Sequence, residues 1–335
     1  MKVDIEQLRR DVRAVLAHHG VPDEEAEVGA EMCLDAELRG HGSHGVRLLR
    51  NVVAQYRHTA ERRSEPKVVH ETPVSARFDG GFHLSWFAHR SAVDIAIAKA
   101  ERSGIAIVSA AGAGVSGALS YLAERMAGAG LVGIAINSSP VTVVAPGTSV
   151  PSLGTNPLAI AVPRRSRPPL VLDMATSSIA FNQILRARDL GQELPAGVAT
   201  DGSGNATRDP AAAIDPVSGR GRILPFGGHR GFGLALMLEL MVSAGVTGRT
   251  GEDKRGPFVQ EPADFSGFYL AYHPDLVGDP AAGAVATERL LSELTGEGVR
   301  LPGEVARVRR DRCYDEGVVE LDYDVLEMLR ELTNA

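Results

Sequence analysis

Apolar residues recur every three or four positions near the N-terminus. Residues 4–19 and 23–39 both follow this period, which predicts two amphipathic helices. Pro22 ends the first helix, and Gly40 is the residue type expected just beyond the end of the second. The pattern predicts a helical lobe over residues 1–65.

After residue 66, helical stretches alternate with short runs rich in β-branched residues. The predicted helices cover residues 89–103 and 118–128. The predicted strands cover residues 105–109, 131–137, 158–162 and 170–172. Such alternation is typical of an α/β core, which we place at residues 66–185.

A Gly/Asp/Pro-rich segment, residues 190–225, interrupts this periodicity and predicts a long functional loop. It is followed by a strongly apolar helix over residues 232–244, with Glu239 near its middle. The two features predict a loop and helix lobe over residues 186–279.

The C-terminal part of the chain adds a strand and two helices to the picture. The strand is expected at residues 267–272 and the helices at 281–295 and 324–332, with a basic stretch at 307–312. We expect residues 280–335 to pack with the N-terminal lobe.

Composition narrows the class of protein. The 335 residues are 44% hydrophobic and 23% charged, with a net charge of -7, which indicates a globular chain with two or three lobes and no basic stripe for nucleic acid. The N-terminus lacks a signal-peptide core, and no apolar run approaches the length of a membrane span, so we expect a cytoplasmic protein without membrane contact. Cys33 and Cys313 are too few for a disulfide framework and are expected to be reduced thiols.

The segment from Arg39 to Val46 holds a candidate catalytic group. His44 follows a predicted helix end and lies among glycines, so its imidazole can exchange a proton near neutral pH. By spacing alone it could equally favour the helix dipole or bond a free carbonyl. A metal site with His41 is disfavoured, because the intervening glycine opposes a helix and no Cys or Glu-x-x-His partner lies nearby.

Gly112, Gly114 and Gly117 match the G-x-G-x-x-G pattern of dinucleotide-binding folds, between a predicted strand and a predicted helix. The next strand ends in Asn137 and Ser138 rather than in the carboxylate that would bind a ribose hydroxyl. Close helix packing or a plain turn is therefore favoured over a Rossmann site.

Five ordered motifs carry a different resemblance. They are Ser43–Val46, Leu153–Ile160, Asp173–Ser177, Asp201 through Pro210, and Pro225–Leu234. Together they resemble the type 2 malate/L-lactate dehydrogenase family, whose relatives include ureidoglycolate, sulfolactate and diketogulonate enzymes and the cyclic ketimine reductases. The resemblance implies an α/β, non-Rossmann, mixed-sheet NAD(P)-binding fold with a helical lobe, usually in a homodimer.

The resemblance also implies a set of cofactor contacts. They are Asn137, Ser138, Thr155, Asn156, Asp173, Met174, Ala175, Thr176, Ser177, His229, Arg230, Pro302, Gly303 and Glu304. Strand ends and helix starts supply N–H groups and short side chains that can hold pyrophosphate and ribose. Each position has a structural alternative, since Thr176 and Ser177 could cap a helix, Arg230 could be a solvated charge and Pro302-Gly303 could be a turn.

In the resembling enzymes a hydride passes between nicotinamide and the carbon next to a carboxylate, and the histidine that matches His44 handles the proton. Ser43 could donate a second hydrogen bond, and Asp201 could orient the imidazole. Asp201 could instead be an Asx-turn residue before Gly202.

The substrate-contact positions depart from the family pattern. Leu48 and Val52 replace an arginine and a tyrosine, Val115 falls where the pattern has a histidine, and Gln183 where it has a lysine. Arg47 is adjacent to the missing arginine but points in a different direction. We assign Arg47, Leu48, Val52, Val115 and Gln183 to the substrate site and expect a substrate larger or less acidic than malate or lactate.

These observations predict an NAD(P)H-dependent reductase for a C=O next to a carboxyl or carboxyl-like group of a specialised-pathway substrate. The alternatives are reduction of a C=N bond, as in a cyclic ketimine, and a catalytically inactive cofactor-binding or assembly subunit. Arg164, Arg165 and Arg167 could approach a 2′-phosphate or face solvent. The choice between NAD and NADP stays open, with NADPH slightly favoured.

Overall fold

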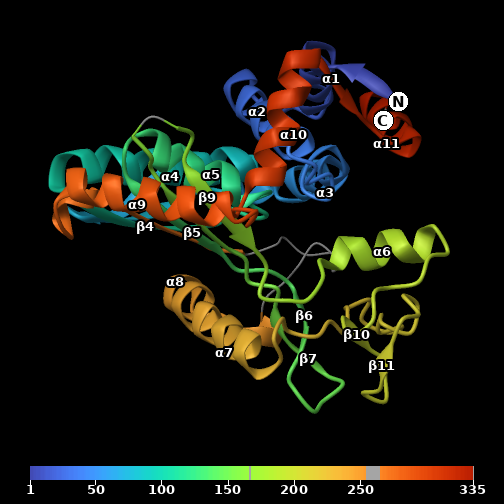
Figure 1. Ribbon diagram of the computed structural model, residues 1–335. Helices are drawn as coiled ribbons and strands as arrows, with labels where there is room; N and C mark the ends of the chain where they lie inside the picture. Colours follow the sequence, from blue (N-terminus) through green and yellow to red (C-terminus); the bar gives the residue numbers. More distant parts are fainter. Residues whose placement is uncertain (166, 254–264, 335) are drawn as a thin grey trace. The chain divides into compact units, whose positions relative to one another are not determined.

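The computed structural model describes residues 1–165, 167–253 and 265–334 and divides the chain into two compact units (Figure 1). The first unit comprises Met1–Ala135, Ala159–Asp173 and Phe268–Ala335, and the second comprises Ile136–Leu158 and Met174–Gly267. The units differ from the three predicted lobes. The N-terminal helices share a unit with the sheet, and residues 136–158 and 174–185, expected in the core, belong to the second unit because the chain leaves the sheet at the strand ends.

The first unit is built on a seven-stranded mixed sheet, as the resemblance implied. Its strand order is β2-β3-β4-β12-β5-β8-β9. The bounds are Lys67–Thr72 for β2, Ser75–Asp79 for β3, Ile105–Ala111 for β4, Gly267–Tyr272 for β12, Val132–Asn137 for β5, Leu158–Val162 for β8 and Leu170–Met174 for β9. β2 pairs antiparallel with β3, and β3 pairs parallel with β4. The alternating residues Ala106, Val108 and Ala110 of β4 are fully buried, as expected for a strand with one face in the core.

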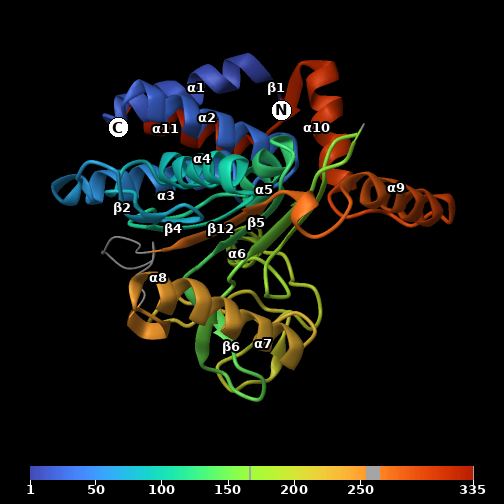
Figure 2. The same ribbon diagram turned by 90° about the vertical axis from the view of Figure 1, so that its left-hand side faces the viewer.

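Helices cover one face of this sheet in two layers (Figure 2). α4 (Ser85–Ser103) and α5 (Leu119–Gly128) lie on the strands, and α1 (Ile5–His18), α2 (Asp23–Leu38) and α11 (Tyr323–Asn334) lie beyond them. β1 (Lys2–Asp4) pairs with β13 (Val318–Glu320), which joins the two ends of the chain. α3 (Val46–His58), α9 (Pro280–Gly296) and α10 (Glu304–Glu316) complete the unit.

The glycine fingerprint serves the packing of this unit. Gly112, Gly114 and Gly117 all have positive φ angles. A Cβ atom at Gly114 would lie 2.4 Å from the side chain of Gln55, and one at Gly117 would lie 2.7 Å from the indole nitrogen of Trp86. The structure thus supports the turn and close-packing interpretation of this motif.

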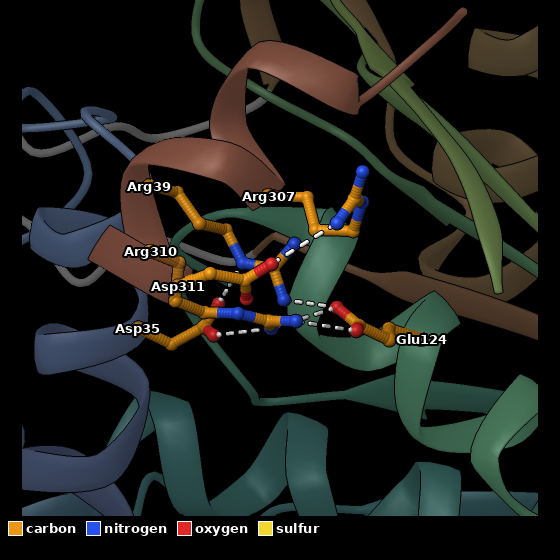
Figure 3. Close-up of polar contacts among 6 residues, drawn as sticks. All are labelled: Asp35, Arg39, Glu124, Arg307, Arg310 and Asp311. Atoms are coloured by element: carbon orange, nitrogen blue, oxygen red, sulfur yellow. Dashed lines mark hydrogen bonds and ion pairs between the residues drawn. The ribbon is translucent and has the colours of Figure 1, made fainter. Parts of the chain in front are cut away.

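An ion-pair cluster joins α2, α5 and α10 (Figure 3). Arg39, at the end of α2, contacts Asp35 and Glu124, and Arg310 of α10 contacts the same two carboxylates. Burial opposes ionisation of Glu124, but Arg310 and Arg39 hold the pKa of this carboxyl below its ordinary value. The basic stretch at 307–312 is therefore part of a helix, and Arg310 in it is paired inside the fold.

A buried histidine connects α4 to the strand and loop beside it. Nε2 of His89 lies 2.9 Å from the carbonyl oxygen of Gly114, and Nδ1 contacts the hydroxyl of Tyr269. Because a carbonyl oxygen can only accept, Nε2 carries the proton and Nδ1 accepts from the tyrosine. Burial lowers the pKa of His89 to about 4, so the ring is neutral in the folded protein at neutral pH.

The second unit holds a hairpin of β6 (Val141–Val144) and β7 (Pro151–Gly154), the helix α6 (Phe181–Asp189) and a small core. In the predicted loop over 190–225, the strands are the two-residue β10 (Ala199–Thr200) and β11 (Ala206–Thr207). Aspartate side chains that accept backbone N–H groups hold the turns of this segment.

The apolar helix of the second unit is longer than predicted. α7 (His229–Leu238) continues through a π-helical segment (Glu239–Ala244) into α8 (Gly245–Thr247). The whole stretch, His229–Thr247, is long and apolar enough to cross a membrane by length and composition, so the statement that no apolar run approaches that length was wrong. Glu239 in its middle is buried, and one of its carboxylate oxygens lies 2.9 Å from the side-chain nitrogen of Asn156.

Both cysteines, Cys33 and Cys313, are free and buried. Burial raises the pKa of the Cys33 thiol well above its ordinary value. The cysteines thus match the expectation of reduced thiols.

Candidate active site

The turn between α2 and α3 carries the predicted proton donor. It leaves α2 through Gly40, whose φ of +82° suits glycine, and enters α3 at Val46. The backbone N–H of His44 donates to the carbonyl oxygen of His41 at 2.8 Å, which closes a tight turn. Two rigid helices therefore hold the His44 imidazole.

Ser43 and His44 are brought into direct contact. The Ser43 hydroxyl lies 2.9 Å from Nδ1 of His44. The other ring nitrogen, Nε2, is therefore the one that can contact a substrate. The imidazole is half-buried. Burial lowers the pKa of His44 below its ordinary value, and the negative charge of Asp173 opposes this shift.

Asp173 at the end of β9 is the carboxylate that acts on this turn. Its charge also raises the pKa of His41, against the larger lowering effect of burial. Asp173 Oδ2 accepts the backbone N–H of Ser120 at 2.8 Å, in the first turn of α5. The sequence predicted Asp173 as a cofactor contact and did not predict its electrostatic effect on the histidines, which comes from the meeting of β9, α5 and the turn.

Ser120 is a polar residue that sequence reasoning missed. Its hydroxyl is buried and has no hydrogen-bond partner among the residues that the structure describes. Since the Asp173 carboxylate already accepts the N–H of Ser120, this unpartnered buried hydroxyl suits a neutral polar group of a ligand. The G-x-G-x-x-G context offered a weak signal, since a helix start was predicted there.

Pro302, Gly303 and Glu304 line a cavity of about 40 Å³. Gly303 has a φ of +71°, and a Cβ there would lie 2.4 Å from the carbonyl oxygen of Val171, so glycine is required for the contact with β9. Four arginines also line the cavity: Arg39, Arg164, Arg307 and Arg310. The turn interpretation of Pro302-Gly303 and a ligand-binding role are thus both compatible with this structure.

The arginines of this cavity differ in how they are paired. Arg164 forms two short contacts with Glu288, 2.7 and 2.6 Å, and Arg39 and Arg310 belong to the buried cluster described above. Arg307 pairs with Asp311 at 3.0 Å, and the two side chains are 37% and 50% exposed. Such an exposed pair contributes little stability, so Arg307 can exchange its partner for an anionic ligand. Arg167 is 70% exposed, and its Nε lies 3.9 Å from Oε2 of Glu288, the carboxylate that pairs with Arg164.

In the second unit, Asn137 is the last residue of β5 and Ser138 follows it. Oδ1 of Asn137 is buried and has no hydrogen-bond partner within the described ranges. The Ser138 hydroxyl lies 3.3 Å from that of Ser266 and accepts the Ser266 backbone N–H at 3.0 Å. Asn137 therefore has an unused hydrogen-bonding group, which fits the predicted contact with a cofactor hydroxyl or amide.

Other predicted cofactor residues have structural partners inside this unit. Asn156 donates to the carbonyl oxygen of Ala235 at 3.1 Å and contacts Glu239, and the Thr155 hydroxyl lies 3.0 Å from that of Ser139. The Thr176 hydroxyl donates to the Thr155 carbonyl at 2.7 Å. These side chains hold the second unit together.

The remaining predicted cofactor contacts lie at the end of β9, in the segment after it and at the start of α7. Met174, the last residue of β9, and Ala175 after it are half-buried, and the Ser177 hydroxyl donates to the Ile179 carbonyl at 2.9 Å. His229 and Arg230 are exposed at the first turn of α7. An exposed arginine beside helix N–H groups is suited to a phosphate.

Asp201 has the geometry of the turn alternative. Its Oδ1 accepts the backbone N–H groups of Ser203 and Asn205, at 2.8 and 2.9 Å, and these bonds hold the pKa of its carboxyl below its ordinary value. Because this carboxylate is used in its own turn, the assignment of Asp201 as the orienting residue stays a prediction. The carboxylate that acts on His44 within the first unit is Asp173.

The predicted substrate positions are largely buried. Leu48 and Val52 belong to the main hydrophobic core, and Val115 packs against it. Val52 also lines a small cavity with Gly112 and Ala113, so α3 and the loop before α5 meet there.

The two polar members of the predicted substrate set have local contacts. Arg47 is held by Asp322 at 2.9 Å and by Asp324 at 2.6 Å. Gln183, in the second unit, accepts the Ala180 N–H at 3.4 Å, a weak bond at the start of α6. Arg47 thus has carboxylate partners of its own and would have to leave them to reach a substrate.

Comparison with known proteins agrees with these motifs. Residues 3–330 match the model of the malate/L-lactate dehydrogenase family. The chain is 33% identical over 341 residues to a delta(1)-pyrroline-2-carboxylate/delta(1)-piperideine-2-carboxylate reductase of Pseudomonas syringae pv. tomato, covering 98% of this chain and 96% of the relative. It is 34% identical over 322 residues to a (2R)-3-sulfolactate dehydrogenase (NADP(+)) of Chromohalobacter salexigens, covering 95% and 93%.

Among solved structures, the sulfolactate dehydrogenase from Methanocaldococcus jannaschii superposes with a TM-score of 0.86 at 30% identity, covering 100% of this chain and 97% of that one. The chain belongs to the malate/L-lactate dehydrogenase family, a family of soluble NAD(P)-dependent dehydrogenases and reductases. The fold, the family and the enzyme class predicted from the sequence are thereby confirmed.

Proposed function

We propose that this protein is an NAD(P)H-dependent reductase that transfers a hydride to a C=O next to a carboxyl or carboxyl-like group of a specialised-pathway substrate. The observation that carries the proposal is the Ser43–His44 hydrogen bond in a turn fixed by two helices and acted on by Asp173. A hydrogen-bonded serine and histidine on rigid supports are suited to deliver a proton to a polarised atom.

Residues of the first unit fit a nicotinamide cofactor, which supplies the hydride when bound. Ser120 has an unpartnered hydroxyl, among the described residues, and the cavity lined by Pro302–Glu304 accepts a small group. His44 then donates from Nε2 to the substrate oxygen while Ser43 fixes the ring through Nδ1. Asp173 stabilises the charged imidazolium before the proton leaves.

The apolar positions support a substrate unlike malate or lactate. Leu48, Val52 and Val115 carry no charge and contact the hydrophobic core. A substrate carboxylate placed against them would lose hydration without a partner, which costs several kcal/mol. The substrate group that lies nearest to these residues is therefore proposed to be apolar or uncharged.

Reduction of a C=N bond is the second candidate, favoured by the 33% identity to the pyrroline- and piperideine-2-carboxylate reductase. Kinetics with a cyclic imine and with its 2-oxo acid analogue separate the two reactions. Turnover of the 2-oxo acid supports C=O reduction, and turnover of the imine alone supports the alternative. Saturable cofactor binding without turnover of any 2-oxo acid or imine would favour the inactive subunit instead.

We propose NADPH as the preferred cofactor, with its additional phosphate bound by Arg307. Arg307 lines the cavity of Pro302–Glu304 and has an exposed partner that it can give up. Arg307→Ala is expected to raise the Kd for NADPH by roughly 10- to 100-fold, the value of a charge-assisted hydrogen bond, and to leave the Kd for NADH unchanged. Titration followed by nicotinamide fluorescence measures both constants.

Arg312→Ala is the matched control for this substitution. Arg312 is on the same helix, 67% exposed, and 4.0 Å from Glu316. The Arg312→Ala substitution also removes one positive charge, but at a position that does not line the cavity, so it is expected to change neither the Kd for NADPH nor the Kd for NADH. Equal losses of NADPH affinity in the two variants would show a general charge effect and would overturn the assignment of Arg307.

We also propose a homodimer formed through the apolar helix of the second unit. Leu236, Met237, Leu240 and Met241 are 39 to 56% exposed on one face of this helix, and such a patch marks an interaction surface. Sedimentation is expected to give twice the chain mass, with a monomer for the Met237→Glu/Leu240→Glu double variant. Val217→Glu, at a residue 95% exposed elsewhere in that unit, is the control; a monomeric native protein would contradict the proposal.

The compartment follows from the same reasoning. The family is one of soluble enzymes, and a long apolar helix whose face is covered by a second subunit needs no membrane. We propose that the protein works in the cytoplasm, with small molecules and its own second copy as partners.

A further inference from the structure

Glu37, in the last turn of α2, reaches across the turn that carries His44. Its Oε1 accepts the backbone N–H of Val46, the first residue of α3, at 2.7 Å. The residue is 5% exposed. Glu37 thus connects the end of one helix to the start of the next, independently of the backbone path through residues 39–45.

The turn is wrapped closely around this carboxylate. A Cβ at Gly45 would lie 2.5 Å from Oε1 of Glu37, and one at Gly42 would lie 3.4 Å from Oε2. Ser43 and His44 are the two residues between these glycines. A shift of the Glu37 side chain would therefore displace the backbone on both sides of His44.

Burying a carboxylate costs solvation free energy, so the interactions of Glu37 must offset that cost. Burial raises the pKa of Glu37, while the hydrogen bond from Val46 and the charges of Arg309 and Arg47 act in the opposite direction. The partial positive charge at the start of α3 also favours a carboxylate there. These interactions give Glu37 a fixed position.

α2 carries a second buried carboxylate that accepts a backbone N–H from the start of another helix. Glu25 is 4% exposed, accepts the backbone N–H of Leu84 at 2.8 Å and contacts Nδ1 of His83. It connects α2 to the start of α4 and does not touch the turn. Glu25 is therefore a matched reference for the cost of losing a buried carboxylate from α2.

We propose that Glu37 is a positioning residue that fixes the Ser43–His44 pair by holding the N-terminus of α3 against the end of α2. The proposal rests on the role of His44 as proton donor in the proposed function. It assigns to Glu37 a geometric task and no contact with substrate or cofactor.

The test compares Glu37→Gln with Glu37→Met in the full-length protein. The glutamine keeps an oxygen that can accept from Val46, whereas the methionine fills a similar volume without an acceptor. We expect kcat within about threefold of the native value for Glu37→Gln and a decrease of roughly 10- to 100-fold for Glu37→Met, as for a small misplacement of a catalytic group. The Kd for the cofactor should be unchanged in both.

A purely structural role would not change the titration of His44. Side-chain NMR of His44 is expected to show a pKa nearer 6.5 in Glu37→Met, since a loosened turn exposes the imidazole, and a native titration in Glu37→Gln. Glu25→Met should lower the free energy of unfolding comparably and leave kcat and the His44 titration unchanged. A Glu37→Met variant with native kcat and native His44 titration would overturn the proposal.

Hydrogen exchange decides the question if Glu37→Met does not fold. The Val46 amide should exchange several-fold more slowly in the native protein than in Glu37→Gln, because a carboxylate is the stronger acceptor. Equal exchange rates would contradict the contact. Failure of the proposed function would be recognised by full turnover in a His44 variant. The NMR and exchange tests of Glu37 do not depend on that result.

Discussion

Replacing His44 with asparagine is expected to lower kcat by roughly 10²- to 10⁴-fold, the usual contribution of a positioned general acid. Asparagine can keep one hydrogen bond to Ser43 and preserves the turn, but it cannot give up a proton at the substrate. Cofactor affinity should stay at its native value, because the substitution changes the proton donor alone. Steady-state kinetics in the reducing direction, combined with NADPH titration, measures both quantities.

The pH profile adds a second readout for His44. Burial lowers the pKa of this imidazole below 6.5, so kcat for reduction should fall as pH rises through that lowered value, and the limb should be absent in His44→Asn. His41→Asn is a control in the same turn that keeps the backbone bond from His44 to His41. Because the charge of His41 lowers the pKa of His44, the limb should remain in this variant and move to higher pH. Native turnover in His44→Asn with intact cofactor binding would remove His44 from the mechanism.

Acid is expected to destabilise the protein through His89. Its folded pKa of about 4 lies below the ordinary value of 6.5, so the unfolded chain binds the extra proton first as pH falls. The free energy of unfolding therefore decreases from about pH 6.5 downward, and the loss from this group is complete near pH 4. The gap between the two values corresponds to about 3 kcal/mol.

Urea denaturation at a series of pH values, followed by the fluorescence of the single, fully buried Trp86, measures this loss. His89→Gln is the informative variant, because its amide can still donate to Gly114 and does not titrate. Its free energy of unfolding should be lower than native at pH 7.5 and depend less on pH between 6.5 and 4. Parallel pH curves for the two proteins would show that the acid sensitivity arises at other groups, such as His41 and His44, whose pKa values are also lowered.

Elements with a strong period were predictable from the chain alone. The helices over 4–19 and 23–39 appear as Ile5–His18 and Asp23–Leu38, and the strand at 267–272 has those bounds. A helix or strand that buries one side along its whole length, as Ile5–His18 does, has a matching period of apolar residues in its sequence. Asp23–Leu38 was predicted from the spacing of Ala26, Ala30, Leu34 and Leu38, although its second half is buried on most sides. Local patterning and long-range packing agree at these places.

Two helices were not predicted individually, although one of them, α3, buries a stripe of apolar residues that includes Leu49, Val53 and Tyr56. Residues 46–58 form α3, and the basic stretch at 307–312 lies inside α10. α10 has one buried residue, Cys313, and its Arg310 contacts carboxylates on α2 and α5. A helix held by ion pairs to distant segments lacks the apolar stripe from which a helix is recognised.

The sequence by itself determined the family, the enzyme class, the Ser43–His44 pair and the motif positions, since these depend on residue types at fixed spacing along one segment. The tertiary structure decided which carboxylate acts on that histidine, Asp173 from a strand 129 residues later, and which one fixes its turn, Glu37. It also assigned the glycine fingerprint to packing. Electrostatic effects and steric contacts depend on distances in space, and those distances are set by how α2, α3, α5 and β9 pack together, which spacing along the chain does not record.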